Sequence, residues 1–225
     1  MSKNWTRPRL SHSKEYPACG LLYGAWDNTA LLTPPTGMHT NNLSEATLAM
    51  ITIRSADRDD LPGILEVYNE AVLHTTATYD YEPRTLEHRI EWFEAHRREN
   101  YPVYVGVDDE SGVVGWSSLN KYHDRPGYRF TTENSIYIAP PHRGHGLGAR
   151  LLAPLIESAR ELGFRAILAG IDAANEPSLR LHARFGFERV AHYKQVGFKF
   201  GRWLDVIYME LLLPGTKTPT PQPQH

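Results

Sequence analysis

The sequence predicts a mixed α/β fold, in which helices pack around one sheet. Two observations predict this class: the order of the strand-like and helix-like segments, and the length of the chain. Two helical segments precede a hairpin, and a strand–helix–strand–helix run and two final strands follow, which is typical of layered α/β domains. The 225 residues suit one domain with extensions, and we expect that domain at residues 50–213.

The two ends of the chain differ in composition from the expected domain. Residues 1–49 show neither strand nor helix periodicity and contain turn-forming stretches such as TPPTG. Residues 214–225, PGTKTPTPQPQH, are rich in proline and contain almost no apolar side chains. We therefore expect a disordered N-terminal extension at 1–49 and a disordered tail at 214–225.

The first part of the expected domain contains one strand and two helices. The alternation of MITIRSA predicts a strand at 50–56. Residues 60–75 predict a helix, because apolar side chains recur on one face and Pro62 occupies the first turn, where a missing N–H costs little. Residues 85–100 predict a second helix with Thr85 as its N-cap.

The central part predicts a hairpin, a strand and a long helix. Residues 102–108 and 113–120 flank the turn DESG, which is typical of a β-hairpin. The segment ENSIYIA, residues 133–139, predicts the next strand, and a helix then runs to about Leu162. Pro154 lies inside this helix, and because proline has no backbone N–H we expect it to kink or shorten the helix.

The last part predicts a strand, a short helix and two strands that close the sheet. RAILAGID, residues 165–172, is typical of a buried strand. Residues 175–187 predict a helix capped by Asn175 and ended by Gly186. The closing strands are expected at 188–196 and 202–213.

Composition and charge exclude several classes of protein. The net charge is −2 and the isoelectric point is near 6.6, so no nucleic acid or membrane partner is expected. The sequence contains no run of about 18 apolar residues that would predict a transmembrane helix. The single cysteine, Cys19, cannot form a disulfide within the chain, which is consistent with the cytoplasm.

The stretch SIYIAPPHRGHGLGARLLAPL, residues 135–155, places three glycines between an expected strand and an expected helix. Gly144, Gly146 and Gly148 allow unusual backbone angles and let a ligand approach the main chain. The start of the helix adds unpaired N–H groups and a positive dipole end, so a phosphate or pyrophosphate is the favoured ligand. The stretch lacks both the Walker GK[ST] and the Rossmann glycine spacing. A plain glycine-rich turn is the alternative.

Two histidines accompany this loop. His142, with Arg143, adds positive charge at the rim, and His142 and His145 form an H-x-x-H pair. A metal site needs further ligands, and none is apparent nearby, so no metal is expected.

The pair of segments IYIAPPHRGHGLGARLL and ANEPSLRLHARFGFE resembles the GCN5-related N-acetyltransferase (GNAT) superfamily. The resemblance implies the fold of that family, a mostly antiparallel mixed sheet flanked by helices, and acetyl-CoA as cosubstrate. It also implies that backbone amides of the loop hold the pyrophosphate and that the strand before it holds the pantetheine. The coenzyme-binding residues implied in this way are Tyr137, Ile138, Ala139, Arg143, Gly144, His145, Gly146, Leu147, Gly148, Ala149, Asn175 and Ser178.

Further segments resemble the phosphinothricin and methionine sulfoximine N-acetyltransferases. They are IRSADRDDLPGILEVYNEAVLHTTATYD, YRFTTENSIYI and QVGFKFGRWLDVIYMEL, and the likeness runs from about Met50 to Leu213. That subfamily acetylates the α-amino group of small glutamate-like amino acids, and its members are homodimers. The resemblance therefore implies detoxification of, or resistance to, such amino-acid analogues.

The chemistry of this reaction singles out three residues. An α-ammonium must lose a proton before its nitrogen attacks a thioester, and Glu133, at the head of the strand that carries Ile138, is the candidate base. A backbone N–H at Ile138 is the expected oxyanion donor. His182 stands where the family often has a tyrosine that protonates the departing thiolate. We expect direct attack in a ternary complex, because no nucleophile triad is present in the core.

The anionic groups of such a substrate call for cations, because arginine binds carboxylates and phosphinates bidentately. The loop YHDRPGYRF contains Arg125 and Arg129, with His123 at a place that relatives fill with arginine. Tyr79, in the loop between the first two helices, is a candidate wall of the substrate site. The segment KFGRWLD, with Trp203, is expected near the substrate or at a dimer contact.

Two other functions remain as alternatives. The same fold acetylates protein N-termini and other amines. A non-catalytic acyl-CoA-binding sensor would keep the coenzyme site without the base.

Overall fold

The computed structural model describes residues 51–215. The predicted extension at 1–49 lies outside the described residues, as does all of the predicted tail except Pro214 and Gly215.

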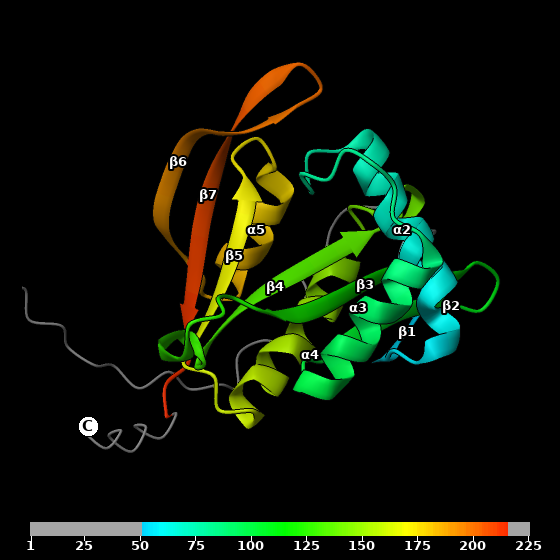
Figure 1. Ribbon diagram of the computed structural model, residues 1–225, viewed down its shortest axis with the longest axis horizontal. Coiled ribbons are helices and arrows are strands. Elements are labelled where there is room, and N and C mark those ends of the chain that lie inside the picture. Colours follow the sequence, from blue (N-terminus) through cyan, green and yellow to red (C-terminus); the bar gives the residue numbers. More distant parts are fainter. Residues whose placement is uncertain (1–50, 216–225) are drawn as a thin grey trace, which may run out of the picture. The chain divides into compact units, whose positions relative to one another are not determined.

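The described residues form a sheet whose strand order is β1-β2-β3-β4-β5-β7-β6 (Figure 1). Every neighbouring pair is antiparallel except β4 and β5, which run parallel. This arrangement confirms the predicted mixed, mostly antiparallel sheet. The strands are β1 (Ile51–Ser55), β2 (Val103–Asp108), β3 (Gly112–Lys121), β4 (Thr131–Ile138), β5 (Ala166–Asp172), β6 (Glu188–Lys199) and β7 (Arg202–Leu212).

Two helices cover each face of the sheet. The helices α2 (Leu61–His74) and α3 (Leu86–Glu99) pack on β2 and β3 through a cluster that includes Ile64, Phe93 and Trp116. On the other face, α4 (Leu147–Glu161) packs mainly on β2, β3 and β4, and α5 (Glu176–Arg184) packs on β5. Apolar side chains at helical spacing thus bury one stripe of each helix, as the sequence periodicity predicts.

The ends of the helices follow the predicted caps. The Thr85 hydroxyl accepts a hydrogen bond from the His88 N–H, and the Asn175 side chain accepts one from the Ser178 N–H. Gly186, just beyond α5, has φ of +85°, a conformation that favours glycine at a helix C-terminus.

Pro154 does not shorten α4, contrary to one of the two outcomes that the sequence predicts. The helix continues past it to Glu161. Proline in a helix interior costs about 3 kcal/mol, but Leu151, Leu152 and Leu155 of the same helix are fully buried against the sheet. Burying one such side chain contributes about 1.5 to 3 kcal/mol, so packing outweighs the local cost.

The strands β4 and β5 separate along their length. They pair only from Thr131 to Glu133 and from Ala166 to Leu168, and beyond that point they diverge, as Figure 1 shows. β5 continues as the partner of β7 to its end at Asp172. The sheet therefore has an opening between the last residues of β4 and the last residues of β5, with unpaired backbone groups at its edges.

Candidate active site

Two cavities meet at the opening between β4 and β5. One, of about 830 Å³, is lined by Arg143, Gly144, Gly146, Gly148, Ala149 and residues of α5, and we name it the glycine-loop cavity. The other, of about 800 Å³, is lined by Glu133, Asp172 and several aromatic side chains, and we name it the carboxylate cavity. The residues that line both cavities are Ala77, Ile136, Tyr137, Asn175 and Ser178. The two cavities therefore share a wall at the opening.

The glycines of the loop differ in what they contribute. Gly144 and Gly146 have φ of +81° and +86°, angles that other residues rarely adopt. Gly148 instead lies in the first turn of α4, where a Cβ would be 2.9 Å from a methyl group of Leu181. The sequence therefore predicts the first two correctly as conformational glycines, whereas the third one lets α4 and α5 approach each other.

The start of α4 is open to an anion. Its N-cap is Gly146, which has no side chain to accept from the first N–H groups of the helix. Of the predicted coenzyme residues, nine line this cavity: Tyr137, Ile138, Arg143, Gly144, Gly146, Gly148, Ala149, Asn175 and Ser178. Ala139, His145 and Leu147 do not, and the Leu147 side chain lies in the core.

Arg143 lines the cavity and also makes two contacts within the chain. Its guanidinium forms an ion pair with Glu70 of α2, and its Nε donates to the Ile138 carbonyl over 2.8 Å. The side chain thus ties α2 and the glycine loop to the end of β4. Three arginines that the sequence did not single out line the same cavity, Arg180, Arg184 and Arg202. The spacing of the first two, four residues apart on an amphipathic helix, is the signal that places them on one helix face.

The edge of β4 presents an N–H group to the opening. The Ala139 N–H donates to the Val114 carbonyl on β3 over 2.9 Å. Because backbone groups of consecutive strand residues point to opposite sides, the Ile138 N–H points away from β3 and toward the opening.

Glu133 lines the carboxylate cavity from β4. Burial raises the pKa of its carboxyl group, and a hydrogen bond from the Gly170 backbone partly opposes this shift. The same carboxylate, together with burial, raises the pKa of the nearby Tyr208. A carboxyl group with a raised pKa at the edge of a cavity is a candidate for proton transfer.

A second carboxylate, which the sequence did not single out, lines this cavity at the end of β5. Asp172 is buried, and its Oδ1 accepts a hydrogen bond of 2.8 Å from the Ala174 N–H. Its Oδ2 is buried and accepts no hydrogen bond from the described residues. Its position as the last residue of a strand was the available signal.

His182 lies at the carboxylate cavity as a buried, hydrogen-bonded side chain. Its Nδ1 lies 2.8 Å from the Ser178 carbonyl, which can only accept, so Nδ1 carries a proton. Its Nε2 lies 3.0 Å from the amide nitrogen of Asn134, which can only donate, so Nε2 accepts. These bonds match a neutral ring, and burial lowers the pKa of His182.

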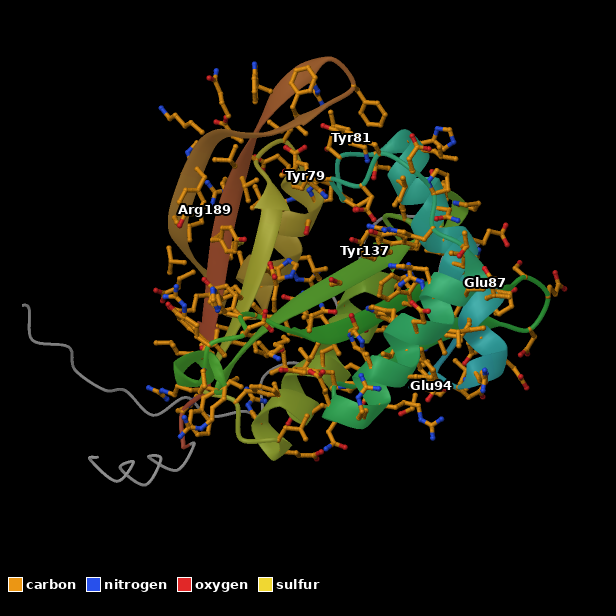
Figure 2. All side chains as sticks on the ribbon, in the orientation of Figure 1. Tyr79, Tyr81, Glu87, Glu94, Tyr137 and Arg189 are labelled. Carbon is orange, nitrogen blue, oxygen red and sulfur yellow. The ribbon has the colours of Figure 1, made fainter. Side chains whose placement is uncertain are left out.

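Aromatic side chains close the carboxylate cavity on the side of the loop after α2. Figure 2 shows Tyr79 and Tyr81 on this loop, beside the β6–β7 hairpin. The Tyr81 hydroxyl donates to the Phe198 carbonyl over 2.6 Å. The Tyr79 ring packs on Gly197 so closely that a Cβ there would be 2.5 Å from it. The prediction that Tyr79 forms a wall of the site agrees with this position.

Lys199 holds the same loop from the hairpin. This side chain is buried, and its Nζ donates to the Thr75 and Thr78 carbonyls over 2.9 and 2.8 Å. Burial lowers the pKa of Lys199. The segment KFGRWLD lies beside the glycine-loop cavity, which Phe200 and Arg202 line, and Phe198, the residue before the segment, lines the carboxylate cavity.

The three predicted substrate cations do not reach either cavity within this chain. His123, Arg125 and Arg129 are exposed and lie before β4, at the end where β4 and β5 are paired. The His123 Nδ1 accepts from the Arg125 N–H over 3.1 Å, and the Arg129 guanidinium lies 4.4 Å from the Phe130 ring. These residues are near Glu133 in sequence but lie outside both cavities. The part of β4 that lines the cavities begins at Glu133 and runs away from residues 123–129.

Residues 51–215 contain no group of three or more His, Cys, Asp or Glu side chains that could hold a metal ion. In the same residues, no helix is long and apolar enough to cross a membrane.

The sequence profile of the acetyltransferase (GNAT) family matches residues 64–187, which is more than half of the chain. The chain belongs to this family. The match confirms the resemblance expected from the glycine loop and its flanking segments.

Similar proteins of known name are acetyltransferases. An L-methionine sulfoximine/L-methionine sulfone acetyltransferase of Salmonella typhimurium is 44% identical over 164 residues, which are 72% of this chain and 95% of the relative.

Two similar solved structures each have a TM-score of 0.73. An acetyltransferase from Salmonella typhimurium with its cofactor acetyl-CoA is 42% identical, and the match covers 76% of this chain and 98% of that one. A phosphinothricin acetyltransferase from Sinorhizobium meliloti in complex with acetyl-CoA is 37% identical, with 76% and 94% covered. This chain is an N-acetyltransferase, and its cosubstrate is acetyl-CoA.

Proposed function

We propose that this enzyme acetylates the α-amino group of a small glutamate-like amino acid, such as methionine sulfoximine, methionine sulfone or phosphinothricin. In this proposal acetyl-CoA occupies the glycine-loop cavity and the amino acid occupies the carboxylate cavity. The observation that carries this proposal is that the two cavities meet at the opening of the sheet. Glu133 and the open edge of β4 both lie at this opening. The relatives named above support the substrate class.

The residues of the glycine-loop cavity fit the coenzyme. A Cβ at Gly144 would meet no atom within 4 Å, so the main chain there is open to a ligand. The uncapped start of α4 suits a pyrophosphate, and Arg180, Arg184 and Arg202 suit further phosphate charge. Bound acetyl-CoA supplies a thioester as acetyl donor.

Glu133 is the proposed base. It accepts, directly or through water, the proton that the α-ammonium must lose before its nitrogen bonds to the thioester carbon. A raised pKa brings this carboxylate closer to the working pH, where it is a stronger proton acceptor than an exposed glutamate. The Ile138 N–H then donates to the oxygen that gains negative charge.

His182 enters the reaction as a neutral ring. Since its Nδ1 proton is donated to the Ser178 carbonyl, only Nε2 is available, and Nε2 must first gain a proton before giving one to the thiolate. Asn134, which now donates to Nε2, would then have to turn its amide oxygen toward the ring.

We infer that the enzyme works in the cytoplasm as a homodimer, without nucleic acid or membrane partners, and detoxifies amino-acid analogues. The support for a dimer is the edge strand β6 and its neighbour β7, which expose several large apolar side chains. They are Val190, Tyr193, Val196, Trp203 and Leu212. Multi-angle light scattering checks the mass, and a monomer at working concentrations contradicts this part.

Thiol release from acetyl-CoA tests the proposed substrate class. We expect turnover with methionine sulfoximine, methionine sulfone or phosphinothricin, and loss of turnover in Glu133→Gln. Turnover only on peptides from a matched panel contradicts the substrate class and favours a protein N-terminus as acceptor. Tight CoA binding without transfer to any amine favours a sensor.

A further inference from the structure

The turn that joins β6 to β7 contains an aromatic residue in an unfavourable backbone conformation. Phe200 and Gly201 form a two-residue turn, with φ of +51° and +73°. Positive φ at both central positions defines the type I′ turn, which favours Asn, Asp or Gly at its first position. A bulky residue with positive φ is an outlier that costs free energy, and such outliers concentrate at functional sites.

The surrounding structure holds this turn in place. Lys199, next to Phe200, binds the Thr75 and Thr78 carbonyls, and its Nζ lies 5.1 Å from the Phe200 ring. Tyr81 binds the Phe198 carbonyl. Figure 1 shows the hairpin of β6 and β7 leaning toward the loop after α2. The turn is therefore fixed to the loop after α2, whose Ala77 lines both cavities.

The Phe200 ring gains little from the packing of this chain. The residue is 56% exposed, although a strained phenylalanine would ordinarily be expected to fill a core position. It lines the glycine-loop cavity. Through Lys199 it is joined to Thr75 and Thr78, which flank Ala77, a residue of the wall that both cavities share. Phe200 and Ala77 therefore line the same cavity.

We propose that Phe200 is a coenzyme-binding residue, whose strained turn presents the ring to the pantetheine arm of acetyl-CoA. This inference rests on the proposed function, because it requires the coenzyme in the glycine-loop cavity. An apolar ring matches the methylene and methyl groups of pantetheine, and the arginines of the same cavity match the phosphates of the nucleotide. The ligand covers the ring that the protein leaves exposed.

Three variants distinguish the effect of the Phe200 ring on CoA affinity from the effect of the backbone strain on Tm. Phe200→Asn removes the ring and relieves the strain, Phe200→Ala removes the ring and keeps strain, and Phe200→Tyr keeps both. We expect Phe200→Asn to raise Tm by about 2 to 4 °C, while CoA affinity falls about tenfold or more. Phe200→Ala should lose the same affinity without the gain in Tm, and Phe200→Tyr should resemble the wild type in both.

Calorimetric titration of CoA and of adenosine 3′,5′-bisphosphate, with Tm by differential scanning calorimetry, provides the measurements. Adenosine 3′,5′-bisphosphate, which lacks pantetheine, should bind the wild type and Phe200→Asn equally. Unchanged CoA affinity in Phe200→Asn overturns the inference, as does an equal loss for the bisphosphate, which would place the ring at the nucleotide. If the wild type itself does not bind CoA, the proposed function fails instead.

Discussion

The two cavities are built in different ways. One wall of the glycine-loop cavity is the main chain of a single short segment, whose φ angles at Gly144 and Gly146 shape that wall. The carboxylate cavity uses side chains from β4, β5, the loop after α2 and the β6–β7 hairpin. A main-chain wall depends on the backbone angles of its own segment, whereas a cavity lined by side chains of several segments depends on how those segments pack.

Glu133→Gln tests the chemistry between the two cavities and has the largest expected effect. We expect kcat/KM for the amino acid to fall by about 10² to 10⁴, the range for loss of a general base. The Kd for CoA should not change, because Glu133 does not line the glycine-loop cavity. Steady-state kinetics and CoA titration measure both, and retention of more than a tenth of the activity contradicts the role of base.

Gly144→Ala tests the main-chain character of the glycine-loop cavity, with Gly112→Ala as its matched control. Both glycines have positive φ, +81° and +73°, and at both a Cβ would meet no protein atom within 4 Å. The two variants should therefore lose similar stability from strain, about 1 to 2 kcal/mol. Only Gly144→Ala should also lose CoA affinity, by about 10- to 100-fold, because its Cβ enters ligand space. Equal CoA affinity in both variants would show that Gly144 is needed only for the backbone conformation of the turn and not for contact with the coenzyme.

Gly197→Ala tests the side-chain character of the carboxylate cavity. Its Cβ would lie 2.5 Å from the Tyr79 ring, so the ring must move. Moving an overpacked side chain costs about 1 kcal/mol or more, which corresponds to a five- to tenfold rise in KM for the amino acid. CoA affinity should not change. In a Tyr79→Ala background the same substitution should have little effect, and an undiminished effect there would exclude Tyr79 as its cause.

The stability of Glu133→Gln tests the pKa of this carboxyl group and has the smallest expected effect. Because burial raises the pKa, the folded state favours the protonated form, and the ionised form destabilises the fold at neutral pH. Glu133→Gln should therefore raise Tm by about 2 to 4 °C at pH 7. The difference should vanish as the pH falls below the unfolded pKa of about 4.3, and calorimetric scans between pH 4 and 7 measure it.

Sequence reasoning was most successful where the signal is local. The glycine loop, the caps Thr85 and Asn175 and the position of Glu133 at the cavity were all expected from short stretches of sequence. It was least successful where a residue acts on a distant segment. Arg143 neutralises Glu70 and binds the Ile138 carbonyl, and Lys199 binds the carbonyls of Thr75 and Thr78.

The substrate cations show the same limit. Arg125 and Arg129 precede Glu133 by a few residues, but an extended strand advances about 3.3 Å per residue. They lie before the first residue of β4, whereas the part of β4 that lines the cavities begins at Glu133 and runs away from them. Asp172, which is far from Glu133 in sequence, lines the same cavity because β4 and β5 are neighbours.

The amino-acid sequence by itself determined the class of enzyme, the order of the elements and the loop that suits a pyrophosphate. These follow from backbone preferences of glycine, proline and capping residues, which act over a few positions. Only the tertiary structure decided which side chains face the acceptor, how His182 is hydrogen-bonded and that Phe200 and Arg202 of KFGRWLD line the glycine-loop cavity. Those outcomes depend on the separation of β4 from β5 and on contacts between segments more than a hundred residues apart.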